Sequence, residues 1–288
     1  MLTADVIITI IINGLISASI YILIALGLNL LFGVSNVINF AHGDVVMLGG
    51  YAAVFFSTLL NLNFLSPIAA FFILGTFGII AERLFFRPLR GRMLACIMLT
   101  MGLGTFLEGL VLAVFGSLHQ GVPPTFAGLL VLGGATFPMQ RMVIIPITAV
   151  AVTFLFIFLH HMKIGKAIRA VAQDSEASAL QGINTDRIAT ITAFISFALA
   201  AISGVLVAPI SSVYAEMGIM PMIKAFIIVI FGGLGSIVGC VFGGLILGFV
   251  ESLGIFFAGS DIATIILFAI LIFTLLIRPR GLMANGSV

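Results

Sequence analysis

Apolar runs long enough to cross a lipid bilayer recur along the whole of this 288-residue chain. A helix that spans a membrane needs about 20 predominantly apolar residues. Hydrophobic residues make up 62% of the chain and charged residues only 8%, whereas a soluble domain carries about a quarter charged residues. The runs are continuous rather than alternating, which excludes a transmembrane β-barrel. The sequence therefore predicts an all-α fold, a polytopic membrane helical bundle.

The bundle is predicted to have about eight spans, one of them broken by glycine. The uninterrupted apolar runs are 6–33, 44–61, 64–82, 94–116, 142–160, 188–210 and 262–277. A further segment, 222–257, contains Gly232, Gly233 and Gly235 at its centre. Glycine permits the backbone to turn, so we expect a re-entrant hairpin or two short spans there. No linker or internal repeat divides the chain, and residues 1–288 are expected to form a single transmembrane domain.

Basic residues predict how the chain is oriented. They gather in three short segments: Arg83, Arg87, Arg90 and Arg92; Lys163, Lys166, Arg169 and Arg187; Arg278 and Arg280. Positively charged loops stay on the cytoplasmic side of a membrane. The N-terminus is therefore expected outside and the C-terminus in the cytoplasm, with an even number of crossings between Arg187 and Arg278. The net charge of +2 gives no indication of nucleic acid binding.

A polar stretch, NVINFAHGD (36–44), lies between the first two apolar runs. If the first helix continues or resumes through it, Asn29, Asn36 and Gly43 share one face, together with Gly33 and Phe40. Such a face either forms hydrogen bonds between helices or lines a translocation path. His42 is either a buried structural histidine or part of a proton relay, and Asp44 is expected to cap the second span. The candidate residues of a path or interface are Asn29, Asn36, Asn39, His42, Gly232, Gly233 and Gly235.

Two acidic residues inside apolar runs are candidates for coupling to protons. Ionisable side chains within a membrane are expensive and mark functional sites. Glu108 and Glu251 are the two acids, but without basic partners in the membrane they make a weak relay. Lys224 is expected to extend its amine towards the membrane surface. On this evidence proton coupling is a secondary hypothesis.

Small residues in the apolar runs are open to two interpretations. Cys96 and Cys240 are expected to be buried hydrophobes, since neither has the histidine or cysteine neighbours of a metal site. We expect no metal, no cofactor and no catalytic residue. Gly235, Gly239 and Gly243 stand four residues apart, a spacing that lets helices approach closely. They either pack helices within one subunit or belong to a mobile or subunit-facing helix.

The longest segment assigned to the cytoplasm, 163–187, has the pattern of one or two short amphipathic helices. Asp174 with Ser175 predicts an N-cap, and Glu176 suits the first turn of a helix. Gly182 suits the left-handed residue that often follows a helix. A short helix of this kind docks into a groove on a partner protein or lies on the membrane surface. The scarcity of aromatic and basic residues in 175–183 favours docking.

The segment EASALQG (176–182) resembles the EAA loop of ABC importer permeases, in which Glu-Ala-Ala is followed three residues later by glycine. Ser178 stands here in place of the second alanine. Three longer stretches, 27–53, 179–206 and 223–252, resemble the LivH-type permeases of branched-chain amino acid importers. The resemblance covers most of the chain in order and is weakest in 117–150.

This resemblance implies a permease subunit in a bacterial inner membrane rather than an enzyme. It implies a second related permease chain, an external binding protein that delivers a branched-chain or other hydrophobic amino acid, and two cytoplasmic ATPase subunits. The residues expected to couple to the ATPases are Asp174, Glu176, Ala177 and Gly182.

One feature of the chain itself agrees with a separate ATPase. Gly165-Lys166 is followed by alanine, and no P-loop of the form G-x-x-x-x-G-K-[ST] is present. Alternatives remain open: a permease of the same type for urea, amides or other amino acids, a passive channel for a small neutral solute, a proton-coupled carrier, and a structural membrane protein.

Overall fold

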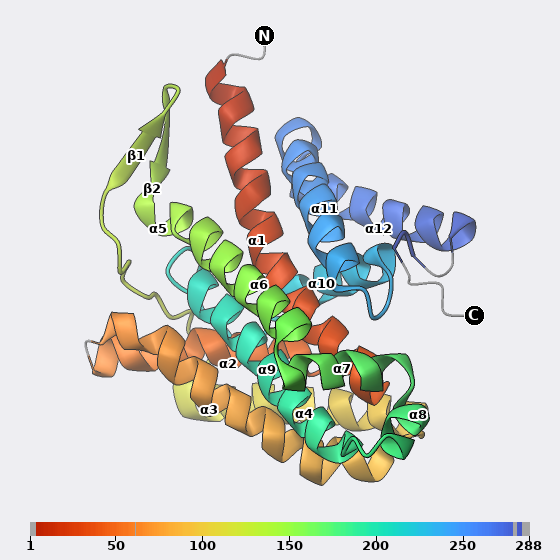
Figure 1. Ribbon diagram of the computed structural model, residues 1–288. Coiled ribbons are helices and arrows are strands. Elements are labelled where there is room, and N and C mark those ends of the chain that lie inside the picture. Colours follow the sequence, from red (N-terminus) through yellow and green to blue (C-terminus); the bar gives the residue numbers. More distant parts are fainter. Residues whose placement is uncertain (1–3, 61, 279–280, 284–288) are drawn as a thin grey trace.

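The computed structural model describes residues 4–60, 62–278 and 281–283 as a bundle of helices (Figure 1). Arg280, one of the basic residues used to predict orientation, lies outside the described residues. The helices are α1 (Ala4–Ser35), α2 (His42–Val54), α3 (Ser66–Ala81), α4 (Met93–Phe115), α5 (Met139–Met142), α6 (Ile144–His161), α7 (Lys163–Gln173), α8 (Ser175–Leu180), α9 (Thr185–Val207), α10 (Ile219–Gly232), α11 (Ile237–Ala258) and α12 (Ser260–Ile277). Single π-helical turns follow α2 at Phe55–Leu59 and α3 at Glu82–Phe86.

In the described part of the chain, seven helical segments are long and apolar enough to cross a membrane. They are Ala4–Ser35, Asn63–Leu89, Met93–Phe115, Met139–His161, Thr185–Val207, Ile237–Ala258 and Ser260–Ile277. The predicted polytopic helical membrane bundle is therefore confirmed. Helices α2 and α10 are not among the seven, so the number of crossings stays a prediction. The outer faces of α4 and α12 expose large apolar side chains, including Leu94, Met98, Phe273 and Leu276, as lipid contact requires.

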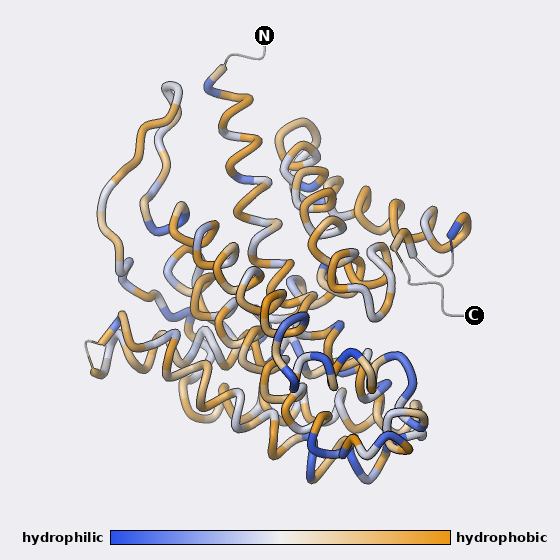
Figure 2. The backbone as a smooth tube through the Cα atoms, in the orientation of Figure 1, coloured by the Kyte–Doolittle hydropathy of each residue, from blue (hydrophilic) through white to orange (hydrophobic). Residues whose placement is uncertain are grey.

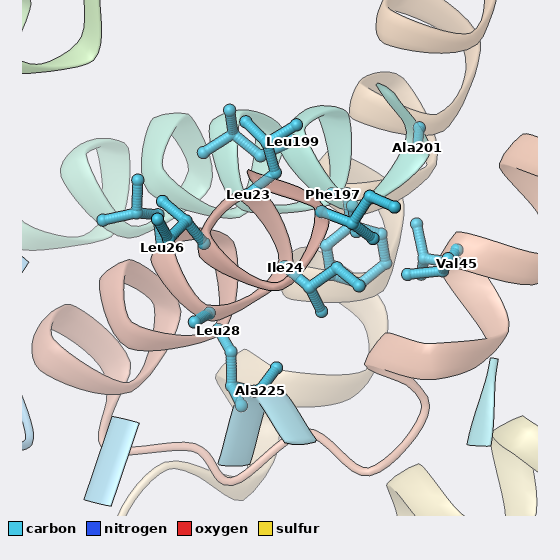
Figure 3. Close-up of a cluster of buried hydrophobic side chains, with 14 of the residues drawn as sticks. Leu23, Ile24, Leu26, Leu28, Val45, Phe197, Leu199, Ala201 and Ala225 are labelled. Atoms are coloured by element: carbon cyan, nitrogen blue, oxygen red, sulfur yellow. The ribbon is translucent and has the colours of Figure 1, made fainter. Parts of the chain in front are cut away.

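Helix α1 forms the centre of the bundle. Leu23, Ile24, Ala25 and Leu26 are consecutive residues, and none has any exposed surface. A helix that is apolar on every side must be covered on every side. Figure 3 shows part of that cover, contributed by α2, α9 and α10: Val45, Phe197, Leu199, Ala201 and Ala225.

Glycine lets the central helices approach backbone to backbone. A Cβ atom at Gly204 of α9 would lie 1.9 Å from the carbonyl oxygen of Val46 in α2. A Cβ at Gly248 of α11 would lie 2.7 Å from the Cα of Ala18 in α1. Near the start of α11, a Cβ at Gly239 would lie 2.1 Å from the carbonyl oxygen of Gly232 in α10. Of the glycines four residues apart, Gly239 and Gly243 therefore pack against α10 within this subunit, whereas a Cβ at Gly235 would meet nothing within 4 Å.

The segment 117–141 contains a small β-hairpin that the sequence analysis does not anticipate. Strand β1 (Leu129–Leu132) pairs with the antiparallel strand β2 (Ala135–Pro138). The two residues between them, Gly133 and Gly134, have φ angles of 55° and 89°. Positive φ at both positions is the geometry of a type I′ turn, which Gly-Gly favours. The hairpin lies beside the N-terminal part of α1 (Figure 1).

The first helix does not continue through the polar stretch. Helix α1 ends at Ser35, and Asn36 has a φ of 50°, a left-handed conformation that asparagine tolerates better than most residues. Residues 36–41 are not helical, and α2 begins at His42. The predicted single face carrying Asn29, Asn36 and Gly43 is therefore wrong, because Asn36 ends the helix.

Helix α2 begins inside the bundle. The Nε2 atom of His42, its first residue, lies 3.2 Å from the carbonyl oxygen of Ile24. Ile24 precedes the end of α1 by several turns, so the stretch 36–41 runs back alongside α1 before α2 starts. The predicted capping role of Asp44 is wrong, because Asp44 lies within the first turn of α2 and the helix has no side-chain cap hydrogen bond.

The predicted break in 222–257 is confirmed. Helix α10 ends at Gly232, and Gly233 and Gly235 have φ angles of 104° and 83°. With 14 residues, α10 is roughly 21 Å long, too short for a bilayer core of about 30 Å. Its last carbonyl groups are not left free: the N–H of Leu282 donates to Phe231 over 2.8 Å, and that of Met283 donates to Gly232 over 3.1 Å. These bonds satisfy the end of α10, whereas Leu234 and Gly235, just after it, are exposed at the surface of this subunit.

Candidate functional site

Helix α8 and its flanking residues have the local geometry that the sequence predicts. The Asp174 carboxylate caps α8, accepting hydrogen bonds from the N–H groups of Glu176 and Ala177, both over 2.9 Å. Gly182 follows the helix with a φ of 81°. Hydrophilic positions gather around α7, α8 and the start of α9 (Figure 2), so α8 lies at a polar end of the bundle.

The outer surface of α8 carries an apolar side chain that the chain itself does not cover. Leu180 is 89% exposed, and Glu176 and Ala177 beside it are also exposed. We call these three residues the α8 surface. Because no other part of the subunit covers Leu180, its side chain is removed from water only when another molecule binds there.

Hydrogen bonds anchor the segments on both sides of α8. Arg169 of α7 donates from Nε to the carbonyl oxygen of Leu159 in α6 over 3.0 Å. On the other side of α8, the N–H of Ile183 donates to the carbonyl oxygen of Ser178 over 3.1 Å. Asn184 then caps α9 by accepting from the N–H of Arg187 over 2.9 Å. The sequence analysis missed this second cap, although asparagine before a helix is its usual signal.

A buried carboxylate joins the segment after α3 to the start of α9. Glu82 has no exposed surface and accepts hydrogen bonds from Arg87 over 2.8 Å, Arg90 over 2.5 Å and Thr190 over 2.9 Å. Arg90 also contacts Asp186 of α9 over 2.5 Å. We call these five residues the Glu82 clamp. The sequence analysis used the two arginines only to predict orientation and missed the clamp.

Asn29 contacts the broken segment directly. Its Oδ1 atom accepts a hydrogen bond from the N–H of Gly235 over 2.7 Å. Both residues line a hollow of about 30 Å³ that also borders Gly33, Arg169 and Ala172. A single water molecule occupies roughly this volume in the liquid. The structure thus brings two predicted path residues together, but at a packing contact beside α7 rather than at an open channel.

Replacing Asn29 with alanine is expected to destabilise the subunit by about 1–2 kcal/mol, because the N–H of Gly235 loses its acceptor. The matched control is Asn36→Gly, because Asn36 is exposed, forms no side-chain hydrogen bond within the described residues, and has a φ of 50° that glycine also adopts. Its substitution is expected to cost about 0.5 kcal/mol or less. Denaturation midpoints in detergent measure both, and equal losses would contradict the assignment.

The other polar residues of the predicted stretch are separated from one another. Asn39 is fully buried, and neither its side-chain oxygen nor its nitrogen has a partner among the residues that the structure describes. His42 is also fully buried, contacting the Ile24 carbonyl and packing edge-on against Phe197. None of these contacts is ionisable, which favours the structural interpretation of His42 over a proton relay.

One predicted intramembrane acid has a basic partner after all. Lys224 of α10 forms an ion pair with Glu251 of α11. The same amine donates to the hydroxyl of Tyr21 in α1 over 2.9 Å and lies 5.1 Å from the centre of its ring. The prediction that Glu251 lacks a basic partner is wrong, as is the prediction that Lys224 extends to the membrane surface. Together these three residues tie α10 and α11 to the central helix.

A second cavity lies between α2, α4 and α10. Its volume is about 180 Å³, and its lining includes Asp44, Thr100, Gly104, Glu108 and Met222. From the sequence, Glu108 was expected to act without Asp44, and Asp44 was expected to be a cap.

Cys96 and Cys240 are buried, as predicted. Among the described residues, no cluster of three or more histidine, cysteine, aspartate or glutamate side chains could hold a metal ion.

Comparison with known proteins agrees with this architecture. Residues 10–275 match the family described as branched-chain amino acid transport system permease component. The chain is 34% identical to the LivH permease protein of Escherichia coli K12, over 96% of this chain and 95% of that protein. It is 33% identical to the BraD permease protein of Pseudomonas aeruginosa over the same shares.

A solved structure supports the fold alone. PsaBC from Streptococcus pneumoniae, in complex with a Fab, superposes with a TM-score of 0.51 at 16% identity, covering 93% of this chain and 91% of that one. The sequence relatives carry the stronger conclusion, because they match nearly the full length at more than 30% identity. The chain therefore belongs to the branched-chain amino acid transport permease family, whose members are membrane transport subunits.

Proposed function

We propose that this chain is a permease subunit of an ABC importer that forms the translocation path for branched-chain or other hydrophobic amino acids. A second related permease chain completes the path, an external binding protein delivers the substrate, and two ATPase subunits drive the cycle. The basic segments face the cytoplasm of a bacterial inner membrane, with the N-terminus outside and the C-terminus inside.

The observation that carries this proposal is the α8 surface. It pairs a capped short helix, whose flanking segments are anchored by hydrogen bonds, with a leucine that is 89% exposed at the polar end of the bundle. A short amphipathic helix docking into a groove is a recurring recognition mode. Asp174 and Gly182 fix the two ends of this helix, so they act by positioning Glu176, Ala177 and Leu180 for the ATPase.

The mechanism that fits these elements is alternating access. Closure of the ATPase pair on ATP displaces α8, and the short α8–α9 connection passes that displacement to α9. Helix α9 packs against α1, α2 and α3, the elements around the centre of the bundle. Rigid elements sliding against one another are a common form of such transitions.

Docking separates this proposal from its alternatives. A passive channel for a small neutral solute has no use for the α8 surface. A proton-coupled carrier loses one of its two candidate acids, Glu108 and Glu251, because Glu251 is paired with Lys224. A permease for urea, amides or other amino acids is the nearest alternative, and the relatives named for branched-chain amino acid transport favour the amino acid.

The test is capture of ATPase activity with the purified subunit. Expressed with its neighbouring transporter genes, the wild type is expected to co-purify with an ATPase, whereas Leu180→Asp retains roughly a tenth of it. Glu176→Lys and Gly182→Trp are expected to act in the same direction. Leu118→Asp is the matched control, because Leu118 is also highly exposed, at 75%, but lies after α4, away from α8. Capture that is equal in the Leu180 and Leu118 variants would refute docking at α8.

A further inference from the structure

The cavity beside Asp44 lies between α2, α4 and α10 and is open at the surface of this subunit, where Met101, Thr105 and Ile219 are exposed. Gly104 is the central residue of α4, a helix long enough to span the membrane, and it borders the cavity together with Thr100 and Glu108. A volume of about 180 Å³ has room for several water molecules or a small polar group, at roughly 30 Å³ per water. Substrate sites in transporters commonly lie near the membrane midplane.

Two helices begin at this cavity. The first residues of α2 include Gly43 and Asp44, the first turn of α10 includes Ile219 and Met222, and these residues line it. The two N-termini almost touch, because a Cβ at Gly43 would lie 2.6 Å from the carbonyl oxygen of Gly218. Interrupted helices whose N-termini meet inside a membrane are a recurring element of substrate sites.

Asp44 presents a carboxylate to this cavity without a partner of its own. Asp44 is 8% exposed, and no other residue that the structure describes forms a hydrogen bond or an ion pair with its carboxylate. A Cβ at Gly104 would lie 2.4 Å from Oδ2 of Asp44, so only glycine at that position leaves the carboxylate its place. Glu108 lines the same cavity, and no lysine, arginine or histidine is among the lining residues that the structure describes. Lys224 of α10 is not available to either acid, because it forms an ion pair with Glu251.

Two neighbouring acidic side chains in an apolar bundle are stable either when protonated or beside a cation, because a buried charge is expensive unless it is paired. We propose that Asp44, with Glu108, binds the ammonium group of the amino acid as it crosses the membrane. This inference rests on the proposed function and adds a substrate-contacting site to it. The ammonium group supplies three hydrogen-bond donors for two carboxylates. The positive ends of α2 and α10 stabilise the negative charges nearby.

The test uses the complete transporter, reconstituted in liposomes with its ATPases and binding protein, and L-leucine as the probe. In Asp44→Asn the maximal uptake rate is expected to fall about tenfold, because a charge-assisted contact is lost. ATP hydrolysis stimulated by the loaded binding protein is expected to stay within about twofold of the wild type, since docking is untouched. Asp44→Glu keeps the charge and is expected to transport faster than Asp44→Asn. Asp261→Asn, at the exposed start of α12, is the matched control and leaves uptake unchanged.

Each outcome decides the question. Uptake by Asp44→Asn within about twofold of the wild type would overturn the ammonium site, as would a parallel fall of uptake and ATP hydrolysis, which indicates a structural role. If Asp44→Asn does not accumulate in the membrane, Glu108→Gln is judged by the same criteria, because Glu108 is half-buried and free of side-chain bonds in the described residues. A wild-type complex that transports neither L-leucine nor any other branched-chain or hydrophobic amino acid would overturn the proposed function and this site together.

Discussion

Replacing Lys224 with methionine is expected to lower the free energy of unfolding of the subunit by about 3–5 kcal/mol. The side chain of Glu251 is only 5% exposed, and its partner in the described residues besides Lys224 is the hydroxyl of Tyr21. Removing the amine leaves a carboxylate in an apolar bundle with no cation. An unpaired charge in that position is far more expensive than the pair it replaces.

The double variant Lys224→Met with Glu251→Leu separates this explanation from a simple loss of packing. It removes both charges and keeps similar volumes, so most of the stability is expected to return. Lys163→Met is the control for removing a lysine at an exposed position, and it is expected to cost about 0.5 kcal/mol or less. Chemical denaturation in mixed micelles measures all three variants. A double variant as unstable as the single one would show that the charge of Glu251 is not the cause.

The second large effect is expected at the Glu82 clamp. The double variant Arg87→Met with Arg90→Met leaves Glu82, which has no exposed surface, without a cation. We expect a loss of about 3–5 kcal/mol, by the same physical reason as for Glu251. The arginine side chains are 35% and 27% exposed, so solvent screens part of their attraction to Glu82 and places the loss towards the lower end of this range.

The same loop offers a matched control for this prediction. Arg83 and Arg92 are exposed and form no ion pair with the residues described. Arg83→Met with Arg92→Met therefore removes the same charge but is expected to cost about 1 kcal/mol or less. Adding Glu82→Gln to the clamp variant is expected to restore much of the loss. Equal destabilisation by the two arginine pairs would rule out the clamp as the source.

The clamp also connects stability to the proposed transport cycle. Asp186 and Thr190 lie in the first two turns of α9, a few residues after α8. The clamp joins this end of α9 to the segment that follows α3. A displacement of α8 therefore reaches α3 through the clamp as well as through the packing of α9 on α3.

Much of the local structure was predictable because it depends on neighbouring residues. The spans follow from the length and continuity of the apolar runs, since an apolar helix in lipid satisfies its own backbone. The cap by Asp174 and the left-handed Gly182 follow from residue types at fixed offsets from a short helix. The break at Gly232–Gly235 follows from the conformational freedom of glycine.

Other features depended on contacts between segments far apart in the chain. Glu251 and Lys224 are separated by 27 residues in the sequence, and Glu82 and Thr190 are separated by 108 residues. No spacing rule pairs residues across such distances. The same holds for Asp44: at the start of a helix its residue type indicates a cap, and only the positions of α4 and α10 turn its carboxylate towards a cavity with Glu108.

The sequence by itself determined that this chain is a helical membrane protein, that the segment 222–257 is interrupted at its glycines, and how the short helix α8 is capped. Each of these results is set by hydrophobicity or backbone preference over a few turns. Tertiary structure alone decided which acids are paired with cations, that Asn29 holds the broken segment, and that α2 and α10 begin at a common cavity. Those results require the helices to be packed, because hydrogen bonds and ion pairs act only over the few ångströms that packing brings within reach.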